Sequence, residues 1–543
     1  MDHRTRELYP WAALGTVVFL CLPILSVTYF PLVDFPNHLA RCWILSHYGA
    51  VAGYRSAYQL VLDPIPNLGV DLVLTALLSI TPLLMAVKLF MVLLVVMYAA
   101  GCHLLFRAVH GEPAWIAIPA MCTVYSSMLL YGFVNYVFGL ALFLIVFACW
   151  LEWRRDWTGW RVAAMVLLVT TAYLAHLSAY AFLGFAFLTV TAWRLARRHL
   201  RVGPALLGLA PLLPPLFLFF IFMTRTGRVG AVQWNTLGNK LAGLAPFFLS
   251  YRLGFDLLFC AVTIALLAAA WSARQGWHAD RMVATVGGLF FIMYLATPLV
   301  LFTSSAADAR WIPPGILLLA ASLHIALERR TARLLFATYM LLSLVRVGLI
   351  WKDWIALDRA TASATRVLDS LPQAARVYPA WFAPVDADHG TGRGRLAAAS
   401  PMLPLYDQVV RERSDKADRS VKHAVFYAVI EKHAVVPTLF AHRGQQPLVW
   451  RGAPPPFQQP DAAHPERWLP LLKAYDFVWT YAAPPEVEQQ LATLAVPVAT
   501  SGASRLWNVH SAIADSPGEP SVVGSHLAKD RADPPRSRRE PQQ

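Results

Sequence analysis

Long apolar runs recur between residues 1 and 350 and determine the class of this protein. Each is long enough to cross a hydrocarbon core of about 30 Å as a helix. Together with shorter runs between them, they predict an all-α polytopic membrane protein of about 11–12 transmembrane or re-entrant helices. The segment 67–84 is expected to be re-entrant or interfacial. The clearest runs are Trp11–Tyr29, Met85–Phe106, Phe133–Leu151, Leu253–Trp271, Val283–Phe302 and Leu334–Ile350.

The pattern changes after about residue 352, where Pro, His and charged residues become frequent and no further run could span a bilayer. The segments HAVFYAVI and YDFVWTYAA are predicted to be short strands, whereas ATASATRVLDSL and PEVEQQLATLA are predicted to be helices. We therefore expect a membrane domain over 1–350 and a small α/β domain over 351–512. The polar, Pro-rich residues 513–543 are typical of a disordered tail.

Basic clusters give the expected orientation, because Lys and Arg mark the cytoplasmic ends of spans. They occur at 154–161, 194–201, 274–281 and 329–333. If these are inside, everything after Trp351 is extracytoplasmic, and a cytoplasmic N-terminus delivers Asp34 to the same outer face. The opposite orientation of the N-terminal part satisfies the same count, so hydropathy alone leaves the side of Asp34 open.

Composition supports the membrane class and argues against a nucleic-acid-binding protein. The chain is 57% hydrophobic and only 14% charged, whereas soluble domains carry about 25% charged residues. The net charge of +14 is explained by basic residues at helix ends, since no Lys/Arg run is interleaved with aromatic residues.

A polar cluster follows the first apolar run, where a simple loop would need no such residues. Asp34, Asn37, His38 and Arg41 all lie in the stretch FPLVDFPNHLARCWIL. Ionisable groups near a bilayer are costly and therefore indicate functional sites. If a helix begins after Pro36, His38 and Arg41 share one face of it. The structural alternative is that Asp34 is only the N-cap of that helix.

Two further polar residues lie near expected outer helix ends. Asn135 stands among aromatic residues in LLYGFVNYVFGLALFL, and His176 is at the turn AHLSAY. Asn135 could instead join packed helices that approach closely at Gly132 and Gly139. His176 could be a hydrogen-bonded histidine at a helix end.

The third polar segment is the loop SSAADARWIPPG, which carries Asp308 and Arg310. Arg310 could pair with Asp308, or it could bind a phosphate through its planar fork of donors. A group of outer cations is consistent with an anionic lipid headgroup as ligand. The further candidates in the long loop are Arg225, Arg228, Lys240 and Arg252.

The motifs VDFPNHLA, YGFVNYVFG and DARWIPP, together with the architecture, resemble the GT-C superfamily of integral-membrane glycosyltransferases. The resemblance implies a polyprenyl-phosphate-linked sugar as donor, an envelope lipid, glycan or protein as acceptor, and a bacterial inner-membrane location with a periplasmic C-terminal domain. It also implies that Asp34 is the general base of an inverting transfer. Arg310, with His38 or His176, would stabilise the departing phosphate, and the remaining polar candidates Asn37, Asn135 and Arg225 would bind substrate.

Members of this superfamily sometimes use a divalent cation such as Mg²⁺ or Mn²⁺ and often have a second acidic residue near the first. Here Phe35 follows Asp34, and the later helix carries Asn135. This departure weighs against metal binding and against activity. Two other classes stay open, a multi-span transporter or flippase and a non-catalytic membrane scaffold. No internal symmetry of the kind common in transporters is evident.

Overall fold

The structure is a computed structural model that describes residues 3–61, 63–154, 156–226, 232–272, 277–301, 304–325, 330–382, 421–441 and 445–509. The predicted tail, 513–543, and Arg228 lie outside these ranges.

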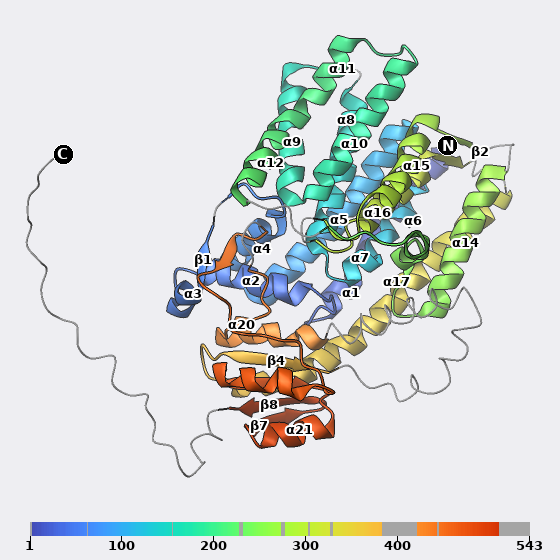
Figure 1. Ribbon diagram of the computed structural model, residues 1–543. Helices are drawn as coiled ribbons and strands as arrows, with labels where there is room; N and C mark the ends of the chain where they lie inside the picture. The colour runs from blue at the N-terminus through green and yellow to red at the C-terminus, as the bar shows by residue number, and fades with distance from the viewer. Residues whose placement is uncertain are drawn as a thin grey trace, which may run out of the picture.

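Helices dominate the part between α1 and α17 (Figure 1). Six helical stretches in the described ranges are long and apolar enough to cross a membrane, and shorter apolar helices lie between them. The predicted class, an all-α polytopic membrane protein, is confirmed. The six are α1 (His3–Ser26), α5 (Leu83–His110), α8 (Val134–Trp153), α10 (Leu177–Ala196), α11 with α12 (Val202–Leu209 and Leu213–Thr226) and α17 (Arg330–Thr365). Other helices are α2 (Phe35–His47), α3 (Ala52–Ala57), α4 (Gly69–Ile80), α6 (Ala117–Cys122), α7 (Ser127–Leu130), α9 (Gly159–Ala175), α13 (Leu237–Ala242), α14 (Leu253–Ser272), α15 (Arg281–Ala296), the 3-10 helix η4 (Ala309–Trp311) and α16 (Ile312–Ser322).

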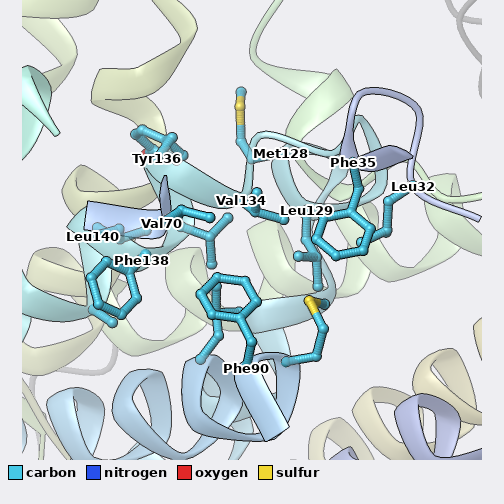
Figure 2. Close-up of a cluster of buried hydrophobic side chains, with 14 of the residues drawn as sticks. Leu32, Phe35, Val70, Phe90, Met128, Leu129, Val134, Tyr136, Phe138 and Leu140 are labelled. Carbon is cyan, nitrogen blue, oxygen red and sulfur yellow. The ribbon is translucent and has the colours of Figure 1, made fainter. Parts of the chain in front are cut away.

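Helix α8 forms the centre of the bundle. Its apolar window is 83% buried, against 44% or less for the other five stretches. A Cβ added at Gly101 of α5 would lie 2.8 Å from Leu144 Cβ, so α5 and α8 pack at a distance that only glycine permits. Figure 2 shows part of the apolar core, in which Phe90 of α5 belongs to the same cluster as Val70 of α4, Phe138 of α8 and Leu32 of the loop before α2.

Helix α4 has 12 residues, which corresponds to about 18 Å. It is too short to cross a hydrocarbon core of about 30 Å alone. Its length therefore agrees with the re-entrant or interfacial helix predicted over 67–84.

The C-terminal part contains a four-stranded mixed sheet in the order β4-β6-β8-β7. β4 is parallel to β6, whereas the β6–β8 and β8–β7 pairs are antiparallel. The strands are β4 (Val377–Trp381), β6 (Phe477–Tyr481), β7 (Val496–Ser501) and β8 (Ser504–Asn508), with α21 (Pro485–Ala492) nearby. The strand predicted in YDFVWTYAA and the helices predicted in ATASATRVLDSL and PEVEQQLATLA are present.

The strand predicted in HAVFYAVI is wrong, because this segment contains the helix α20 (Phe426–Lys432). Residues 424–430 are all buried, and α20 packs on α2. A short run that is apolar at every position has neither a two-residue nor a 3.6-residue period, so the pattern could not separate a strand from a buried helix.

Two elements, a long helix and a two-stranded ribbon, join the C-terminal part to the membrane part. α17 continues without a break through the predicted domain boundary at 350/351, and its end is held by a bond from Ser504 Oγ to Ala364 O of 3.1 Å. In addition, β1 (Tyr58–Leu60) pairs with β5 (Leu448–Trp450) in an antiparallel ribbon. The exact domain limits stay a prediction. The remaining strands, β2 (Trp277–Ala279) and β3 (Leu323–Ile325), pair with each other.

The sidedness of the chain can be tested at two exposed positions. α8 has 20 residues, about 30 Å, so Asp156 beyond its end lies roughly one bilayer from residues near its start. We expect Asp156→Cys to react with an impermeant maleimide only from the cytoplasmic side, and Gln489→Cys on α21 only from the opposite side. The measurement is labelling of intact and permeabilised cells, with the two partly exposed thiols Cys149 and Cys260 replaced by alanine. Labelling of both cysteines from one side would contradict this orientation.

Candidate functional site

A cavity of about 770 Å³ lies where the loop before α2, the starts of α8 and α10, and the loop before η4 meet. Six of the residues singled out from the sequence line it, although they come from four separate segments. They are Asp34, His38, Arg41, Asn135, His176 and Arg310.

Asp34 occupies the N-cap position of α2, but its side chain makes no cap hydrogen bond. Its carboxylate therefore does not serve the helix in the way the structural alternative required. The backbone of Asp34 is fixed instead, because its N–H donates to Tyr131 O at 3.0 Å and the N–H of Val33 donates to Leu130 O at 3.2 Å. The carboxylate is half-buried in the cavity wall.

Gly132 makes this arrangement possible. Its φ is +80°, and a Cβ added there would lie 2.4 Å from Asp34 N. The predicted close approaches at Gly132 and Gly139 are both present, since a Cβ at Gly139 would lie 2.6 Å from His176 Cβ. Glycines thus bring the loop of Asp34 and the turn of His176 against the start of α8.

His38 lies one turn after Asp34 and contacts a buried ion pair. Arg41 is 1% exposed and Asp71 of α4 is 2% exposed, and Arg41 NH2 lies 2.6 Å from Asp71 Oδ1. The same NH2 group lies 2.9 Å from His38 Nδ1. Burial, with a smaller contribution from the charge of Arg41, holds the pKa of His38 well below its ordinary value. The imidazole is therefore neutral at physiological pH.

Asn135 and His176 are connected through Asn67, a residue that the sequence analysis missed. Asn135 Nδ2 donates to Asn67 O at 3.2 Å, and Leu177 N donates to Asn67 Oδ1 at 3.3 Å. His176 caps α10 by accepting from Ser178 N at 3.1 Å. The interpretation of His176 as a hydrogen-bonded helix-end residue is thus correct, and its ring nevertheless lines the cavity.

Arg310 is not the partner of Asp308. The buried Lys240 lies 3.3 Å from Asp308 Oδ2 and also donates to Tyr294 O and Thr297 O. Arg310 NH2 donates to Ser305 O at 3.2 Å, and its guanidinium lies 5.8 Å from the ring centroid of Phe133. Burial lowers its pKa to about 10, so the side chain stays cationic at neutral pH. Arg310 is therefore a cation in the cavity wall, and Asp308, the nearest carboxylate in sequence, pairs with Lys240 and not with Arg310.

Two predicted ligand-binding residues lie elsewhere. Asn37 is buried, donates to Thr438 O at 2.9 Å and accepts from Phe440 N at 2.8 Å, so its amide binds the C-terminal segment. Arg225 is 58% exposed and pairs with Asp63 at 2.8 Å. Neither lines the cavity, and this geometry does not support a ligand-binding role for them. Lys240 and Arg252 are also used internally, since Arg252 pairs with Asp353 at 2.7 Å.

The cavity has a second wall that is apolar. It is formed by side chains of α12 and α15, which are Leu216, Phe219, Phe222, Met293 and Ala296. Phe440, bound through its N–H to Asn37, and the neighbouring Gln445 and Gln446 complete the lining from the C-terminal part. The cavity can therefore accept a molecule with one charged end and one hydrocarbon end.

The side chains present do not fit a divalent cation. Asp34 is the one carboxylate among the residues that line the cavity. In the described ranges no group of three or more His, Cys, Asp or Glu side chains is placed to hold a metal ion. No step of the mechanism below passes through a metal.

Comparison with known proteins gives a likeness in structure only. No family model matches the sequence, and no curated protein matches it. The fold is similar to that of ArnT from Cupriavidus metallidurans bound to undecaprenyl phosphate, with a TM-score of 0.50, 12% identity and coverage of 92% of this chain and 98% of that chain. The apo ArnT structure matches with a TM-score of 0.46 and 14% identity over 94% and 99% of the two chains. The likeness to the bound structure confirms the GT-C-like fold expected from the sequence.

The role of Gly132 generates a testable prediction. Gly132→Ala should destabilise the protein, because an L residue in left-handed conformation costs roughly 1–2 kcal/mol and the new methyl group would displace Asp34. Gly184→Ala is the matched control, since nothing lies within 4 Å of a Cβ at that helical position. Thermal unfolding of the purified protein in detergent measures both. Equal stability of the two variants would show that the turn does not fix Asp34.

Proposed function

We propose that this protein is an integral-membrane glycosyltransferase that moves a sugar from a polyprenyl-phosphate donor to an acceptor of the cell envelope. The observation that carries the proposal is the cavity in which Asp34 and Arg310 share one space with an apolar wall from α12 and α15. The fold likeness to ArnT, a structure bound to undecaprenyl phosphate, supports it. By its resemblance to the GT-C superfamily, the reaction is proposed to take place at the extracytoplasmic face.

The reaction needs a base for the acceptor. In the proposed step Asp34 takes the proton of an acceptor hydroxyl as that oxygen attacks the anomeric carbon of the donor. The bond from the anomeric carbon to the phosphate oxygen breaks, the phosphate leaves with the electron pair, and the configuration inverts. A positioned base contributes roughly 10²–10⁴-fold to such a proton transfer.

The leaving group needs a cation. A lipid phosphate gains negative charge as the bond breaks, and a preorganised donor in a partly dry site stabilises that charge without reorganising. Arg310 is suited to this because Asp308 is occupied by Lys240. The apolar residues of α12 and α15 would contact the first isoprene units of the donor. Acceptor and sugar would enter from the side that carries Phe440, Gln445 and Gln446.

The proposed location is the bacterial inner membrane, with a cytoplasmic N-terminus and the C-terminal sheet in the periplasm. A transporter or flippase of the same lipid would use the same cavity and would need Arg310, but it would need no proton acceptor. The role of Asp34 therefore separates the two classes.

Asp34→Asn should abolish most of the transfer activity. Asn has a similar shape and is about as good an N-cap as Asp, so folding should be unchanged, whereas turnover should fall roughly 100-fold or more because the base is lost. The measurement is sugar transfer from a polyprenyl-phosphate sugar in membranes at matched protein levels. Full transfer activity of this variant would show that Asp34 is not the base, whereas no transfer by the wild-type protein would leave the transporter and scaffold interpretations.

Arg310→Lys should also impair turnover, because an ammonium group cannot reproduce two parallel donors on a phosphate. We expect a loss of about tenfold or more, the scale of one hydrogen bond to a charged group. Arg225→Lys is the matched control outside the cavity and should keep wild-type activity. If both variants behave alike in the transfer assay, Arg310 does not bind the phosphate.

A further inference from the structure

The buried Arg41–Asp71 pair lies beside the cavity, which is lined by Arg41 and by His38, the ring that Arg41 contacts. Arg41 lies on α2 and Asp71 in the first turn of α4, so the pair joins the two short helices beside the cavity. Asp71 Oδ1 accepts from both Nε and NH2 of Arg41, at 3.1 and 2.6 Å. The N-terminal end of α4 favours the negative charge of Asp71. Arg41 is therefore held from one side by a fixed carboxylate.

The position of Arg41 determines what His38 can do. A guanidinium has five donors and no acceptor, so in the 2.9 Å contact between Arg41 NH2 and His38 Nδ1 the nitrogen of His38 must accept. A neutral imidazole that accepts at Nδ1 carries its proton at Nε2. Protonating Nδ1 would place an N–H against the buried cation, so His38 is a poor base as well as a fixed donor.

The pair is not explained by stability alone. A buried ion pair is often no more stabilising than apolar residues of the same size, because the desolvation of both charges offsets their attraction. Its specific consequence here is that it fixes the orientation and the tautomer of the His38 ring, which lines the cavity. This ring lies one helical turn after Asp34, because the backbone N–H of His38 donates to the backbone carbonyl of Asp34 at 3.2 Å.

We propose that the chain Asp71–Arg41–His38 is a positioning device that holds His38 as a neutral Nε2–H donor. His38 then donates a hydrogen bond to an oxygen of the bound donor phosphate and leaves the role of base to Asp34, the carboxylate among the described lining residues. In this device Asp71 and Arg41 are positioning residues that act through His38. This inference rests on the proposed transferase function, which it deepens by separating the roles of two adjacent polar residues.

The direct test is the protonation of His38 in the full-length protein. Histidine labelled with ¹⁵N in the ring, in protein reconstituted into lipid nanodiscs, gives a His38 signal that is assigned by difference from His38→Gln. We expect a proton on Nε2 only, with no titration from about pH 5 to pH 8, the range in which an unperturbed histidine changes charge. A proton on Nδ1, or titration in this range, would overturn the proposal.

The second test removes the device without leaving a buried charge. Arg41→Met/Asp71→Leu replaces both charged groups by apolar ones, whereas a single Arg41→Met would leave Asp71 unpaired in the interior. In the double variant we expect His38 to lose its single tautomer and to titrate. The described charged or titratable groups of the cavity lining are then Asp34, Tyr136, His176, Tyr180 and Arg310. Transfer turnover should fall by about tenfold or more, as for the loss of one hydrogen bond to a charged group.

Arg252→Met/Asp353→Leu is the control, because this pair does not line the cavity. It should leave the His38 spectrum and the pH profile of transfer unchanged. A wild-type tautomer and a wild-type pH profile in Arg41→Met/Asp71→Leu would refute the role of Arg41. The spectrum requires no turnover, so an inactive wild-type protein with the expected tautomer would refute the transferase function and the substrate contact while the positioning of His38 holds.

Discussion

The candidate site depends on the backbone hydrogen bonds between the loop before α2 and the turn before α8. Val33 and Asp34 donate to Leu130 and Tyr131 in succession, and the left-handed Gly132 allows the two chains to approach. This contact places Asp34 against the turn that leads into α8, the most buried of the six long apolar stretches. The backbone of Asp34 is thus fixed independently of its side chain, which makes no cap hydrogen bond to α2.

Buried ion pairs determine which of the described cationic side chains lines the cavity without a carboxylate partner. Arg41–Asp71, Lys240–Asp308 and Arg346–Asp256 each enclose one carboxylate, and removing one member of such a pair typically costs about 3–5 kcal/mol. Lys240 is the most consequential of these cations, since it occupies Asp308 and leaves Arg310 cationic beside the cavity. Ion pairs with Asp71 and Asp308 thus leave Asp34 as the carboxylate, and Arg310 as the guanidinium without a carboxylate partner within 4 Å, among the described lining residues.

Much of this arrangement followed from local sequence, and the rest required contacts that no local pattern encodes. The spans, the short α4 and the strand in YDFVWTYAA could be predicted because hydropathy and period are local properties. Asp34, His38, Asn135, His176 and Arg310 were found because a polar residue at a membrane helix end is conspicuous.

Asp71 was missed because its carboxylate is buried against Arg41, and Asn67 was missed because a Pro-Ile-Pro-Asn run indicates only a turn. Asn37 and Arg225 are equally conspicuous in sequence, but one binds the C-terminal backbone and the other faces away from the cavity. The helix α20 was mistaken for a strand because its apolar run has no period.

The bonds from Asn37 to residues 438 and 440 have a consequence for the biogenesis of the protein. They join positions 401 and 403 residues apart in the chain, and the ribbon of β1 with β5 is formed by similarly distant segments. Synthesis proceeds from the N-terminus, so the loop of Asp34 enters the membrane long before its final partner is translated. The cavity cannot be completed until the segment that carries Phe440, Gln445 and Gln446 has been made and folded against α2. A chain that stalls or terminates before Phe440 would carry every residue of the polar cluster at Asp34 and still lack this wall, so maturation of the cavity waits for a late stage of translation.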